Sequence, residues 1–153
     1  TAAGRHPAAR GASSGRRRHR DLTVTHVPSR HWGARVIEDS HRGYGGYVLR
    51  DHKHSIYHAG DTAYFAGFRE IGQRLAPELA LLPIGAYNPP SFRNVHTSPG
   101  DAMRAFFDLN ARWMVPMHYG TFSTLTGTPS RLRELVEPRG VQVLELQPGE
   151  TTT

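Results

Sequence analysis

One stretch of the sequence is a short apolar run that is followed by a glycine and then by an aspartate. The run Ser55 to His58 is typical of a strand, Gly60 ends it, and Asp61 follows. Because apolar residues then recur at helical spacing from Ala63 to Leu75, we expect Asp61 between the end of a strand and the start of a helix, where α/β proteins place reactive groups. The structural alternative is that Asp61 or Thr62 caps the helix by accepting a backbone N–H.

Two histidines occupy equivalent positions, each where a strand-like segment changes to a loop. His31 follows the first predicted strand and His118 follows the fifth. An imidazole offers one neutral nitrogen, and a carboxylate can bridge two cations about 3.5 to 4 Å apart. If these junctions share one sheet edge, then His31, Asp61 and His118 form a hydrolytic metal site. The alternatives are a polar residue beside a packed Trp32 for His31, and a turn histidine bonded to backbone for His118.

Length and composition limit the classes of protein. The 153 residues, 37% of them apolar, suit one globular domain, and no cysteine is present. A metal site must therefore use histidines and carboxylates. No run of 18 or more apolar residues predicts a membrane span, and no apolar core of a signal peptide is present, so we expect a cytoplasmic protein.

The net charge of +6 is concentrated at the N-terminus. Residues 1–20 contain six of the 19 basic residues and no acidic one, which leaves 13 basic against 13 acidic residues in 21–153. We expect residues 1–20 to be a disordered Arg-rich tail and residues 21–153 to be the folded domain. The tail suits an arm for anionic partners, a targeting segment or a solvated leader. Nucleic acid is not an expected partner of the neutral domain.

Strand-like and helix-like segments alternate beyond the tail, which predicts a mixed α/β sheet with about three helices. The expected strands are 22–27, 44–49, 55–58, 78–84, 113–117 and 141–146, and the expected helices are 63–75, 98–109 and 130–136. The long loop 86–97 carries His96 and is expected to bind a ligand.

Four motifs resemble those of a known family in their order and spacing. They are Val27–Trp32, His58–Thr62, Leu82–Tyr87 and Met117–Phe122. They are similar to the later motifs of the metallo-β-lactamase superfamily, most of all to the branch that contains N-acyl-phosphatidylethanolamine-hydrolysing phospholipase D. The resemblance covers about residues 21–125. It implies that the chain is the C-terminal half of an αβ/βα sandwich.

The resemblance also implies a function for four residues. It implies a hydrolase with two Zn²⁺ ions, in which His31 ligates one ion, His118 ligates the other and Asp61 bridges both. His96 matches a histidine near the substrate phosphate, where it stabilises negative charge or aids proton transfer, so Asp61 and His96 are the expected catalytic residues. The alternative for His96 is a structural neighbour of the next helix. The implied substrate is a small-molecule or lipid phosphodiester, although lactones fit the branch as well.

One family motif is absent. The first half of the family's fold supplies further ligands from a His-x-His-x-Asp-His motif, and this sequence has only Asp51–His54, in another order and place. Each zinc would then have one histidine and the shared aspartate, fewer than the three protein ligands usual for catalytic zinc. We therefore expect weak zinc binding and a partner, either the missing N-terminal half or a second copy. The alternative function is a non-catalytic fragment or interaction module that pairs with another chain.

Overall fold

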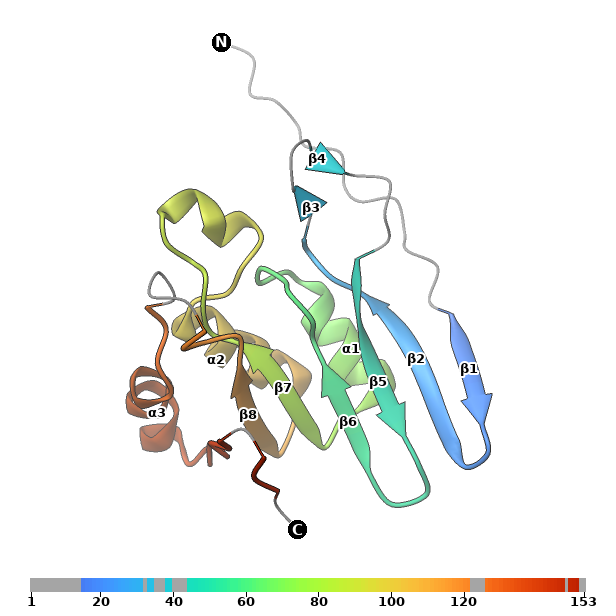
Figure 1. Cartoon of the computed structure of the whole chain (residues 1–153). Helices are drawn as coiled ribbons and strands as arrows, with labels where there is room; N and C mark the ends of the chain where they lie inside the picture. Colours follow the sequence, from blue (N-terminus) through green and yellow to red (C-terminus); the bar gives the residue numbers. More distant parts are fainter. Residues whose placement is uncertain are drawn as a thin grey trace.

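Six strands form one mixed sheet in the computed structural model, which describes residues 15–31, 33–34, 38–39, 44–121, 126–147 and 149–151 (Figure 1). Their order is β1-β2-β5-β6-β7-β8; the first four are antiparallel neighbours, and β6, β7 and β8 are parallel. The strands are β1 (Arg16–His19), β2 (Leu22–Pro28), β5 (Gly45–Arg50), β6 (Ser55–His58), β7 (Leu79–Pro83) and β8 (Trp113–Met117). A separate pair joins β3 (Gly33–Ala34) to β4 (Glu38–Asp39). The predicted mixed α/β sheet is confirmed.

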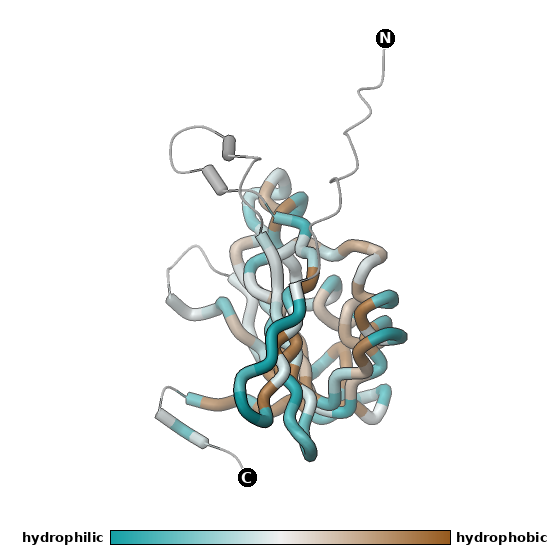
Figure 2. Tube along the Cα trace, turned by 90° about the vertical axis from the view of Figure 1, so that its right-hand side faces the viewer, coloured by the Kyte–Doolittle hydropathy of each residue, from teal (hydrophilic) through white to brown (hydrophobic). Residues whose placement is uncertain are grey.

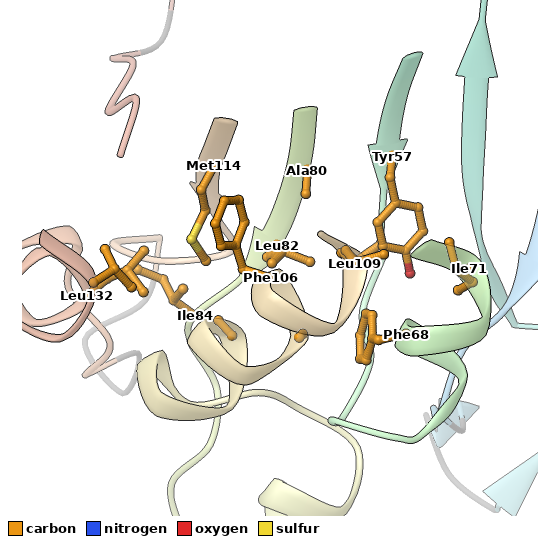
Figure 3. Packing of buried hydrophobic residues seen from close by; sticks show 14 of the residues in the cluster. Tyr57, Phe68, Ile71, Ala80, Leu82, Ile84, Phe106, Leu109, Met114 and Leu132 are labelled. Carbon is orange, nitrogen blue, oxygen red and sulfur yellow. The ribbon is translucent and has the colours of Figure 1, made fainter. Parts of the chain in front are cut away.

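Three α-helices cover one face of this sheet. They are α1 (Gly67–Leu75), α2 (Pro99–Leu109) and α3 (Pro129–Val136), and two 3-10 helices, η1 (Pro90–Asn94) and η2 (Glu137–Arg139), lie in the connections. Tyr57, Ala80 and Met114 point from the sheet towards Phe68 and Phe106 of the helices, which forms the buried core (Figure 3). Among the described residues, no helix is long and apolar enough to cross a membrane.

The opposite face of the sheet is open in the described part of the chain. Seen edge-on, the sheet has the helices on one side only (Figure 2). Since side chains alternate between faces, the neighbours of the core residues point to the open side. Tyr47 of β5 is 47% exposed and Ile56 of β6 is 36% exposed, and both belong to this face. The sheet therefore presents apolar side chains on a second face.

The two helices that flank the site begin in different ways. Helix α2 begins with a capping box, in which the Ser98 hydroxyl accepts from the Asp101 N–H and the Asp101 carboxylate accepts from the Ser98 N–H. Helix α1 begins four residues later than expected, and its N-cap residue Ala66 has no side-chain cap. Capping by Asp61 or Thr62 is therefore the wrong interpretation, because neither residue adjoins the first turn.

Two expectations about the ends of the domain are wrong. The sequence predicts a tail that is disordered to residue 20, but Arg16–His19 form β1, whose backbone pairs with β2. Residues 1–14 lie outside the described part of the chain. The strand expected at 141–146 is reduced to a single bridge between Met114 and Val143. In both places the sequence shows the local composition, whereas pairing with another strand decides the structure.

Candidate metal centre

Four polar side chains meet beyond the C-terminal ends of β2, β6 and β8. The Nε2 atom of His118 lies 3.6 Å from Oδ1 of Asp61. His31, Asp61 and His96 each offer a ligand atom, and these three atoms lie within 4.8 Å of one another. The convergence expected for His31, Asp61 and His118 is thus confirmed, and His96 joins them from the loop after β7. The roles of these residues as ligands or catalysts stay predictions.

The segment around Asp61 is held against the segment that carries His31. The buried Thr62 hydroxyl accepts from the Arg30 N–H (2.9 Å) and donates to the Ala63 carbonyl (2.8 Å). The Ala63 N–H donates to the Arg30 carbonyl (2.8 Å). Thr62 therefore fixes the position of the loop, which leaves the neighbouring Asp61 carboxylate, 44% exposed, for a ligand.

The tautomer of His31 follows from its hydrogen bond. Its Nδ1 atom lies 3.0 Å from the carbonyl oxygen of Val95. Because a carbonyl only accepts, Nδ1 carries the proton, and the lone pair of the neutral ring is on Nε2. A hydrogen bond of this kind from the second ring nitrogen is typical of metal-binding histidines, since it fixes the ring and its tautomer.

His96 lies near the end of the loop 86–97, next to a residue that anchors the loop to the sheet. The next residue, Thr97, is buried and its hydroxyl donates to the Pro83 carbonyl at the end of β7. Burial lowers the pKa of His96, and the neighbouring imidazoles of His31 and His118 lower it further. The neutral ring, which keeps a lone pair for a cation or a proton, is therefore favoured at neutral pH.

His118 has a backbone conformation that few residues other than glycine adopt. Its φ is +59°, in the left-handed region. Gly85 lies directly against it, since a Cβ atom on Gly85 would be 2.1 Å from the His118 carbonyl oxygen. The glycine of the Leu82–Tyr87 motif therefore allows the two strand ends to approach closely. The sequence showed this glycine within the motif but not the contact that requires it.

Two hairpin histidines, His52 and His54, lie outside the centre. His52 is 3.4 Å from Asp21 and His54 is 3.6 Å from Glu78, all on the turns at the other end of the strands. In the described part of the chain, no second group of three histidines or acids has its ligand atoms so close together.

The donor set fits a divalent metal ion. Imidazole nitrogens with one carboxylate are the ligands that Zn²⁺ and its first-row neighbours accept. The Nδ1 atoms of His96 and His118 are buried without a hydrogen-bond partner among the described residues. Buried polar atoms are rarely left unpaired, so these nitrogens indicate a bound ligand or a neighbouring group in the complete site.

The comparisons with known proteins identify the family. A sequence model described as the beta-lactamase superfamily domain matches residues 5–119. A UPF0173 metal-dependent hydrolase of Methanopyrus kandleri is 35% identical over 136 residues, which are 85% of this chain and 56% of the relative. The chain belongs to the metallo-β-lactamase superfamily, as its four motifs predicted.

Solved structures share the fold. Igni18, a novel metallo hydrolase from Ignicoccus hospitalis, is 29% identical, with a TM-score of 0.75 over 90% of this chain and 57% of that one. The metallo-β-lactamase fold protein YhfI from Bacillus subtilis is 14% identical, with a TM-score of 0.67 over 89% of this chain and 51% of that one. The chain thus spans about half the length of the proteins that it matches.

Proposed function

We propose that this chain is part of a zinc-dependent hydrolase that cleaves phosphodiesters, in the manner of the N-acyl-phosphatidylethanolamine-hydrolysing phospholipase D branch that its motifs resemble. The observation that carries the proposal is the approach of His31, Asp61, His96 and His118 at one sheet edge. The name of the Methanopyrus kandleri relative, a metal-dependent hydrolase, supports the same class of reaction.

Three residues would hold the metal ions. His31 and His118 would each ligate one Zn²⁺, and Asp61, whose carboxylate faces His118, would bridge both. When bound, the two cations supply Lewis-acid polarisation of a phosphoryl oxygen and compensate its charge. The Asp61 carboxylate also places a negative charge near the imidazoles of His31 and His118, which favours binding of cations at this edge.

His96 would act on the substrate side of the centre. Its lowered pKa keeps the ring neutral at neutral pH, so the ring binds a proton only when negative charge develops beside it. The phosphodiester assignment depends on this role, because a positioned imidazole can donate a hydrogen bond to a phosphate oxygen. The buried Thr97 anchor would hold the ring in place during that step.

The open face of the sheet supports a partner, and we propose the remaining half of the fold. The relatives have nearly as much chain again beyond the part that this chain covers. On the open face, Ile56, Leu79 and Trp113 line a hollow of about 400 Å³. Apolar surface of this kind is usually covered by another part of the protein or by a partner. The part of the relatives that this chain does not match would form a second layer on this face.

The same face favours a second candidate function, that of a non-catalytic module whose sheet packs against another chain. It needs only the apolar face, whereas the hydrolase also needs the metal centre. A location in the cytoplasm is part of the proposal in both cases.

The test is turnover with and without the remaining half. The 153-residue chain is mixed with the non-matching half of the Methanopyrus kandleri relative, and hydrolysis of bis(p-nitrophenyl) phosphate is compared with that of a p-nitrophenyl carboxylic ester. We expect chelator-sensitive phosphodiester hydrolysis by the mixture and little by the chain alone. A stable complex without turnover of either substrate would favour the interaction module, and preference for the carboxylic ester would refute the phosphodiester assignment.

A further inference from the structure

His96 lies where the chain lacks a third ligand for its first cation. His31 and Asp61 alone are fewer than the three protein ligands of a catalytic zinc site. The ligand atoms of His31, Asp61 and His96 nevertheless lie within 4.8 Å of one another. Three ligands about 2.0 to 2.2 Å from a tetrahedral zinc are about 3.3 to 3.6 Å apart, so side-chain movements of about 1 Å would close the triangle.

We propose that the chain by itself binds one divalent cation between His31, Asp61 and His96. This inference rests on the metal-dependent function proposed above and deepens it. His96 serves as the third ligand when the other half of the fold is absent. It becomes available to substrate when that half supplies its own ligands.

One loop both orients and completes this triangle. The Val95 carbonyl accepts from Nδ1 of His31 and thereby directs the Nε2 lone pair of that ring to the cation. The next residue along the chain, His96, supplies the third donor. The His31 and His96 rings are 5.2 Å apart between centroids and nearly perpendicular, at 76°. A cation that binds here therefore contacts two rings whose relative position is set by a single peptide segment.

The environment of His96 leaves its ring available to a cation. Its Nδ1 atom is buried without a hydrogen-bond partner in the described part of the chain. On its other side the ring stacks on His118, with centroids 5.5 Å apart and planes at 15°. The in-plane lone pairs of two nearly parallel rings lie in nearly parallel planes, so they do not converge on one shared point. His118 is close to Asp61 but joins no second triangle among the described residues, so we assign it to the second cation.

The experiment is calorimetric titration of the metal-free 153-residue chain with ZnCl₂, with Co²⁺ absorption as a second readout of ligand geometry. We expect one Zn²⁺ per chain and a Co²⁺ spectrum of low coordination number. His96→Ala is expected to lower the zinc affinity at least about tenfold, since even residues behind the ligands have effects of about 10- to 100-fold. The control His52→Ala, at the far turns, is expected to change it less than about threefold.

Three outcomes would overturn the inference. Loss of binding in His118→Ala with retention in His96→Ala would make His118 the third ligand. Binding of zinc only after addition of the relative's other half would overturn this inference and leave the proposed function standing. Absence of binding under both conditions would refute the proposed function too. If circular dichroism shows that His96→Ala is unfolded, His96→Gln, which keeps the size of the side chain, replaces it.

Discussion

Gly85→Ala is expected to disturb the metal centre through the backbone of His118. The added Cβ would lie 2.1 Å from the His118 carbonyl oxygen, whereas real Cβ contacts essentially never fall below 3.0 Å. One of the two strand ends must therefore move by about 1 Å, and His118, already at φ +59°, has few alternative conformations. Overpacking of this size costs about 1 to 3 kcal/mol.

Thermal unfolding and turnover measure the two consequences. For a chain of this length, each kcal/mol lowers Tm by about 2 to 4 °C. A displacement of about 1 Å at a reacting centre lowers turnover by about 10²-fold, so the complemented complex should lose most of its phosphodiester hydrolysis.

Gly100→Ala is the matched control. The nearest heavy atom to its added Cβ is the Ser98 hydroxyl oxygen at 3.9 Å, and alanine is the better residue within α2. We expect the control to be unchanged or more stable by up to about 1 kcal/mol. If Gly85→Ala were as stable and as active as this control, the close approach of the strand ends would not be what positions His118.

Three further changes have defined outcomes. Asp61→Asn removes the bridging anion but keeps the shape, so the complemented complex should bind zinc at least about tenfold more weakly by calorimetry. Tyr57→Phe removes a hydroxyl that is buried without a hydrogen-bond partner among the described residues, so the free energy of unfolding in urea should stay equal or rise by about 1 to 3 kcal/mol. Asp101→Asn should cost about 1 kcal/mol at neutral pH because it breaks the capping box of α2. Burial acts to raise the pKa of Asp101, but hydrogen bonds from Ser98 and Arg93 outweigh it and lower the pKa. The wild type should therefore lose this advantage as the pH falls below the ordinary pKa of aspartate, about 3.9. Urea titrations at several pH values measure this as a shrinking difference in the free energy of unfolding between the wild type and Asp101→Asn.

Elements with local signals were predictable from the sequence. The capping box needs only Ser98 and Asp101, which lie within four consecutive residues, and α2 begins there. The runs Ser55–His58 and Trp113–Met117 form β6 and β8 with the expected bounds, because apolar residues bounded by glycine or polar residues have few alternatives.

Elements that depend on pairing with another strand more than on their own composition were not predictable. Arg16–His19 lacks an apolar face, and only its pairing with β2 makes it a strand. The alternation of residues 141–146 predicts a strand. In the structure this segment pairs with β8 at one position only, between Val143 and Met114. Of the site, the residue types and the strand-end positions of His31, Asp61 and His118 could be predicted. The position of His96 beside His31 could not, because it depends on the course of the loop 86–97 and on the Thr97 anchor.

The central claim is that this sheet edge provides part of a metal centre that the other half of the fold completes. The most direct test is the zinc content of the chain, measured after dialysis, with and without the complementary half of the Methanopyrus kandleri relative. We predict one Zn²⁺ per chain alone and two per complex, with both lost in Asp61→Asn. A complex that forms through the open sheet face but contains no zinc, or equal zinc in the Asp61→Asn complex, would contradict it.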